Sequence, residues 1–92
     1  MSTLIEHLQH DVEDWFYNYF TLDNFDDTDE LIDGLYKAIQ IQRASSILSN
    51  CFDAMVCDYN WNPNVISNNY EAIEDTVYDN AVWKLSRYGI SL

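Results

Sequence analysis

The chain has few of the residues that interrupt helices and few positive charges. Two Gly and one Pro among 92 residues provide few positions that would interrupt a helix, so a mostly helical fold is expected. Only 4 Lys and Arg oppose 16 Asp and Glu, which gives a formal net charge of -12. A surface this negative repels nucleic acid and anionic membranes and attracts basic proteins. We therefore expect no direct nucleic-acid binding and no membrane binding.

Long hydrophobic runs are also absent. No stretch approaches the ~18 apolar residues of a membrane span, and residues 1–6 lack the basic start and long apolar run of a signal peptide. We therefore expect a cytoplasmic protein. The two cysteines, Cys51 and Cys57, lie in apolar stretches outside any ligand-like cluster, which predicts buried, reduced thiols.

Apolar residues are plentiful enough to form a core. They make up 48% of the chain and include 3 Trp, 7 Tyr and 4 Phe, so we expect a folded domain rather than a disordered acidic chain. Residues 1–92 fit one acidic helical domain, too short for a large enzyme architecture. A chain of this size buries only about two-thirds of its unfolded surface, so homodimerisation is expected to add stability.

A first helix is predicted from about residue 4 to residue 20. Thr3 and Glu6 have the spacing of a capping box at its start. Its apolar side chains recur at intervals of three and four on one face: Ile5, Leu8, Val12, Trp15, Phe16 and Tyr19. Residues 21–28 are rich in turn-forming side chains and predict a loop with Phe25 pointing inward.

A second helix is predicted to start after Asp27 or Thr28, and helical periodicity then continues to Tyr59. The apolar face turns by about half a revolution near residues 40–46. Either the helix breaks around residues 44–46, which we favour, or one long helix packs its two halves against different neighbours.

The C-terminal part predicts one further helix. Residues 60–64 hold three Asn and Pro63, which should end the preceding helical run. The last helix should begin near Asn68 or Asn69, with Asn68 and Glu71 as a capping box, and end at Gly89. The sequence therefore predicts an all-α fold, a small bundle of three to four helices that forms a homodimer.

The negative charge is concentrated at the N-terminal end. Residues 1–36 hold ten acids and no Lys or Arg, residues 37–70 are neutral, and residues 71–92 carry -2. The neutral middle, residues 38–59, is the most apolar part, as expected of a central helix buried in the bundle or in a dimer seam. Solubility of a small domain is served by a net charge of about 2 to 8 in magnitude, so the excess indicates a further use.

That excess is comparable with the charge of duplex DNA. Duplex DNA carries one charge per about 1.7 Å, so twelve charges match about 20 Å of duplex, and the 24 of a dimer match about 41 Å. Carboxylates on helices are held in a fixed array, as phosphates are. The composition therefore indicates a DNA mimic, an acidic decoy for proteins that grip the phosphate backbone through Lys and Arg.

The acidic segments DVEDWFYNYF (residues 11–20) and DDTDE (residues 26–30) resemble, with the length and acidity of the chain, phage-encoded DNA-mimic anti-restriction proteins of the Arn type from T-even coliphages. The resemblance implies a dimeric inhibitor of a host modification-dependent restriction endonuclease of the McrBC type. Other DNA mimics divert host nucleoid-associated proteins, so that target class stays open. If the protein is phage-encoded, it would act in the host cytoplasm.

The charge layout, rather than the resemblance, supplies the candidate site residues. The phosphate-mimicking carboxylates are Glu6, Asp11, Glu13, Asp14, Asp26, Asp27, Asp29, Glu30 and Asp33, extended by Glu71, Glu74, Asp75 and Asp79. Among the aromatic residues, Tyr17, Trp61 and Trp83 are candidates for a partner or dimer contact. The alternative is an acidic interaction module, antitoxin- or adaptor-like, that docks one basic segment without imitating DNA.

Other chemistry has little support in the sequence. The segment from Asp23 to Gly34 lacks the oxygen ligands of an EF-hand at the required positions. His7 and His10 are expected to be solvated rather than zinc-binding. No Cys–His nucleophile, Gly-rich phosphate loop or carboxylate pair in a cleft is indicated. We therefore expect no metal, no cofactor and no enzymatic activity.

Overall fold

The structure is a computed structural model that describes residues 3–40 and 46–91. Every regular element in these residues is a helix, which confirms the predicted all-α fold. The helices are α1 (Leu4–Tyr19), α2 (Thr28–Ile39), α3 (Ser46–Cys57), α4 (Pro63–Asn68) and α5 (Tyr70–Arg87). The described residues thus form five helices rather than the predicted three to four, and none of these helices is long and apolar enough to cross a membrane.

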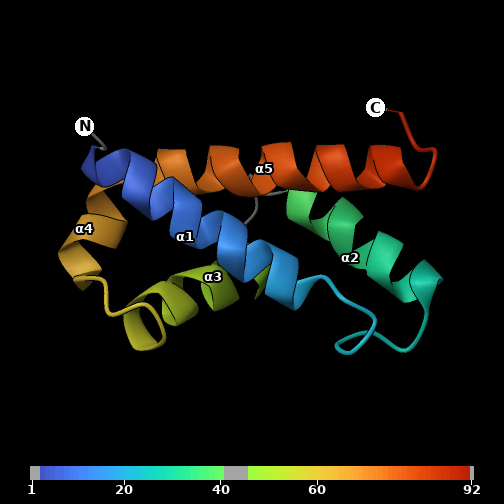
Figure 1. The fold of residues 1–92 in the computed structure, drawn as a ribbon, viewed down its shortest axis with the longest axis horizontal. Coiled ribbons are helices and arrows are strands. Elements are labelled where there is room, and N and C mark those ends of the chain that lie inside the picture. The colour runs from blue at the N-terminus through green and yellow to red at the C-terminus, as the bar shows by residue number, and fades with distance from the viewer. Residues whose placement is uncertain (1–2, 41–45, 92) are drawn as a thin grey trace.

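The longest helix, α5, organises the arrangement (Figure 1). Helices α1 and α2 pack against it, α3 packs mainly against the other side of α1, and α4 connects α3 and α5 at one end. The buried side chains of α5 include Ile73, Val77, Ala81 and Leu85, spaced by four residues. Helix α5 is therefore the central helix of the described chain, while residues 38–59 include the end of α2 and the whole of α3, which carries buried residues of the core.

Helix α1 follows the sequence prediction closely. The Thr3 hydroxyl accepts a hydrogen bond from the Glu6 amide at 3.1 Å, as the capping-box spacing predicted. The buried residues are Leu8, Val12, Trp15 and Phe16. The loop that follows α1 turns Phe25 inward, where its ring stacks on Phe20 with centroids 5.7 Å apart.

Two helices lie in residues 28–40 and 46–60, and Gln40 is not helical, so the open choice is decided in favour of a break. Helix α2 ends at Ile39, and the Gln40 amide donates to the Tyr36 carbonyl at 3.2 Å. Helix α3 begins at Ser46; Ala44 and Ser45, where a break was predicted, lie outside the described residues. The apolar faces of the two segments differ by about half a turn, so α2 and α3 pack against different neighbours, α2 mainly against α5 and α3 mainly against α1.

The segment around Pro63 differs from the prediction. Pro63 starts the short helix α4 instead of only ending the run before it, because proline needs no amide hydrogen bond in a first helical turn. The Asn62 side chain caps α4 by accepting from the Asn64 amide at 2.8 Å. Asn68 is the last residue of α4, so the predicted capping box between Asn68 and Glu71 does not form.

The end of α5 was predicted correctly. Gly89 has φ of +80°, and its amide donates to the Ser86 carbonyl at 3.0 Å. The Ile90 amide donates to the Leu85 carbonyl at 3.1 Å, which completes a Schellman motif. Glycine is favoured there because a side chain disfavours positive φ.

The two cysteines have different environments. Cys51 is buried on the inner face of α3, and burial raises the pKa of its thiol to about 12. Cys57 is exposed, so the prediction that both thiols are buried was wrong for Cys57. Six residues turn a helix by about 240°, which carries Cys57 away from the core.

Candidate partner-binding surface

All thirteen predicted carboxylates lie at the surface, where a partner could reach them. Four are on α1, five lie at or within α2 and the loop before it, and four are on α5. Asp11 and Glu74 are half-buried and the other eleven are exposed. The predicted site is therefore divided among three segments of the chain: α1, α2 with the loop before it, and α5.

Two carboxylates of α1 accept hydrogen bonds from the segment that follows α3. The Asp11 carboxylate accepts from the indole N–H of Trp61 at 2.8 Å, and Asp14 accepts from the Tyr59 hydroxyl at 2.6 Å. Tyr59 and Trp61 follow α3, so these contacts fasten the end of α3 to α1. Partial burial, together with the Asp14 carboxylate, raises the pKa of Tyr59 to about 12. Trp61, predicted as a partner contact, is half-buried and has an internal partner.

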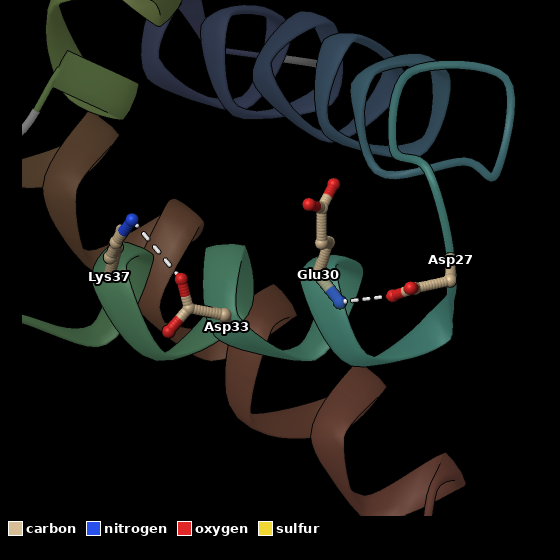
Figure 2. Close-up of polar contacts among 4 residues, drawn as sticks. All are labelled: Asp27, Glu30, Asp33 and Lys37. Atoms are coloured by element: carbon tan, nitrogen blue, oxygen red, sulfur yellow. Dashed lines mark hydrogen bonds and ion pairs between the residues drawn. The ribbon is translucent and has the colours of Figure 1, made fainter.

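The acids at the start of α2 are also partly committed to local structure. The Glu30 amide donates to the Asp27 carboxylate at 2.9 Å, which caps the helix (Figure 2). The Glu30 carboxylate accepts from the Asp26 amide at 3.2 Å. Asp33 forms an ion pair with Lys37 at 3.1 Å, seen in the same view. Both side chains of that pair are about two-thirds exposed, so its contribution to stability is small.

Most of the remaining predicted carboxylates have no partner in the described chain. On α5, Glu74 lies beside the Tyr70 phenol, whose pKa is raised by desolvation and then by this carboxylate. Seven predicted carboxylates accept no hydrogen bond and form no ion pair within residues 3–40 and 46–91: Glu6, Glu13, Asp26, Asp29, Glu71, Asp75 and Asp79.

Five of these free carboxylates are on α1 and α5. The two helices lie side by side and run in the same direction (Figure 1). Near their C-terminal ends the Tyr17 and Trp83 rings contact edge to face, with centroids 6.4 Å apart. One turn earlier on each helix come Glu13 and Asp79, because residues four apart share a face.

Other acids of the two helices lie nearer to their starts: Glu6 on α1, and Asp75 and Glu71 on α5. We define the α1–α5 acidic face as Glu6, Glu13, Tyr17, Glu71, Asp75, Asp79 and Trp83. Asp26 and Asp29 belong to the loop before α2 and to the first turn of α2.

The net charge per unit length of the molecule is lower than that of a DNA duplex. It extends 35 Å along its longest axis, so -12 corresponds to one net charge per about 2.9 Å. Duplex DNA carries one charge per about 1.7 Å. One protomer therefore has about 60% of the linear charge density of a duplex.

The structure offers little for catalysis or metal binding in the part that it describes. A groove of about 450 Å³ beside α1 is lined by Trp15, Asn18, Tyr19, Asn24, Asp58 and Tyr59, and so contains a single carboxylate. Among residues 3–40 and 46–91, no group of three or more His, Cys, Asp or Glu side chains is placed to hold a metal ion.

Sequence reasoning missed the internal roles of Asp11 and Asp14. Their partners lie 45 to 50 residues away, and no local pattern connects them. The role of Asp27 and Glu30 could be found, since their spacing of three is that of a capping box. No protein-family profile, curated protein or solved structure matches the chain.

Proposed function

We propose that this protein is a DNA-mimic inhibitor that binds in the DNA-binding site of a host protein. Its target would be a modification-dependent restriction endonuclease of the McrBC type, with a nucleoid-associated protein as the second target class. It would act in the host cytoplasm by occupying that site, without catalysis or a cofactor. The observation that supports this most is the α1–α5 acidic face, whose carboxylates have no partner among residues 3–40 and 46–91.

The spacing of these carboxylates suits proteins that bind phosphates. Glu71, Asp75 and Asp79 follow one another at intervals of four residues, which is about 6 Å along a helix axis. Alternate phosphates of one DNA strand are about 6.8 Å apart along the duplex axis. Lys and Arg side chains are long and adaptable enough to accommodate that difference.

The proposal includes a homodimer. One protomer is sparser in charge than DNA, and its 12 net negative charges match only about 20 Å of duplex. Two protomers would double the length of the acidic array to that of about 12 base pairs. Restriction and nucleoid proteins contact DNA over lengths of this order, so a dimer fits their binding surfaces better than a protomer.

Inhibition of a purified McrBC-type endonuclease tests the proposed target. We expect the protein to block cleavage of modified DNA, and excess unmodified duplex to release the enzyme from the inhibitor. Inhibition should weaken steeply with salt, because it replaces phosphate contacts. Undiminished cleavage at a large excess of the protein would reject this target, and a nucleoid-associated protein would then be assayed by the same displacement of DNA.

One observation favours the alternative function. Exposed aromatic rings, Tyr17 and Trp83, lie within the acidic face, and such rings are enriched in protein–protein interfaces. An antitoxin- or adaptor-like module would use them to dock one basic segment by ordinary complementarity. Its complex with a partner would persist in excess duplex DNA, whereas that of a DNA mimic would not.

A further inference from the structure

Two exposed aromatic side chains at the end of the α1–α5 acidic face lack an explanation in the fold. Trp83 is 51% exposed and Tyr17 is 46% exposed, so neither contributes its full area to the core. Their rings are perpendicular, with centroids 6.4 Å apart. Phosphate imitation needs only carboxylates, so the pair is expected to have a separate role.

The structure already shows what the Trp83 ring can bind. The Arg87 guanidinium lies over it, 5.5 Å from the ring centroid, at a distance typical of a cation–π contact. Arg87 is itself exposed and forms no ion pair in the described part of the chain. An exposed arginine can therefore be exchanged for another cation at little cost.

The surroundings favour a guanidinium over an ammonium group. Asp79 lies one turn before Trp83 on α5, and Glu13 lies one turn before Tyr17 on α1. A planar guanidinium can stack on an indole and still donate hydrogen bonds to a carboxylate in its own plane. A compact, strongly hydrated lysine ammonium combines the two contacts less well.

We propose that Trp83, Tyr17, Glu13 and Asp79 form an anchor for one arginine of the basic partner, and that Arg87 covers the Trp83 ring of this anchor in the free protein. The anchor rests on the proposed function only in requiring a cationic protein partner. It strengthens the preference for arginine over lysine beyond that of an array of carboxylates alone.

Binding of nona-arginine and nona-lysine peptides, measured by calorimetry at low ionic strength, tests the anchor. The wild-type protein should bind nona-arginine more tightly. Trp83→Leu should weaken nona-arginine binding about 2- to 5-fold, the range of an exposed cation–π contact, and should reduce the preference for arginine. Tyr78→Leu is the matched control, because Tyr78 is a 40% exposed ring on the same helix, and should change neither value.

A second pair of variants tests the role of Arg87. Arg87→Gln should strengthen nona-arginine binding about 2- to 5-fold more than Lys84→Gln, because both remove one positive charge from α5 and only Arg87 lies over the ring. Equal effects of Arg87→Gln and Lys84→Gln, or of Trp83→Leu and Tyr78→Leu, would overturn the proposal.

A measurement on the wild-type protein covers the case in which Trp83→Leu does not fold. The indole N–H resonance of Trp83, assigned through Trp83→Phe, should shift on adding nona-arginine while that of the buried Trp15 stays in place. An unmoved Trp83 resonance would refute the anchor. These experiments contain neither DNA nor a target enzyme, so their failure is distinct from a failure of DNA mimicry.

Discussion

Glu13 and Asp14 are neighbours in the sequence but lie on different sides of α1. Asp14 faces the segment after α3 and accepts a hydrogen bond from Tyr59, whereas Glu13 faces solvent beside α5 and has no internal partner in the described chain. The first carboxylate stabilises the fold, and the second is available to a partner. Acidity alone therefore does not separate a carboxylate that serves the fold from one that a partner could reach.

The largest effect on affinity should come from neutralising carboxylates of the α1–α5 acidic face. The triple variant Glu13→Gln, Asp75→Asn, Asp79→Asn should weaken binding to the target on the order of 10- to 100-fold at low salt, because three phosphate-like contacts are lost. Its stability should stay near that of the wild type. The matched control neutralises Asp23, Asp53 and Asp58, three exposed acids outside the face, and should have a much smaller effect on affinity.

Removing the hydrogen bond between Tyr59 and Asp14 should lower stability and leave affinity unchanged. Tyr59→Phe should lower the free energy of unfolding by about 1 to 2 kcal/mol, because it removes a hydrogen bond to a carboxylate. Its affinity for the target should not change. Urea denaturation and binding assays measure the two effects, and a variant that lost affinity at unchanged stability would contradict the division between Asp14 and Glu13.

The stability of the protein should depend on pH through the hydrogen bond between Tyr59 and Asp14. Since folding raises the pKa of Tyr59 from 10.0 to about 12, its stabilising contribution is complete below pH 10 and is lost as the pH rises through 12. We expect a loss of about 1 kcal/mol between these limits that is missing in Tyr59→Phe. Cys51 titrates in the same direction and is present in both proteins, so the difference between them isolates Tyr59.

The smallest effect is expected at the exposed ion pair of α2. Lys37→Gln should change the free energy of unfolding by less than about 0.5 kcal/mol, because both partners are largely solvated. It should also free Asp33 and raise affinity for a basic partner slightly. A large loss of stability on denaturation would show that Lys37 does more than pair with Asp33.

Local features of the fold could be predicted from the sequence. The Thr3 cap of α1, the Asp27 cap of α2 and the Gly89 end of α5 all depend on residues within four positions of one another. The start of α4 at Pro63 was missed because proline both ends a preceding helix and begins a new one.

The division of the carboxylates could not be predicted. Asp11 binds Trp61, 50 residues away, and Tyr17 meets Trp83, 66 residues away, so each pairing depends on how the helices pack. Periodicity identifies the buried face of α1 but not which neighbour covers each flank. The ten acids of residues 1–36, expected to form one surface, are consequently spread over α1, the following loop and α2.

Competition with DNA tests the proposed mimicry most directly. The immobilised protein would be saturated with a purified DNA-binding partner and then washed with duplex DNA at constant ionic strength. A DNA mimic predicts that the partner is released in proportion to the DNA added, and that the Asp23, Asp53, Asp58 control variant behaves like the wild type. Retention of the partner at saturating duplex DNA would contradict DNA mimicry.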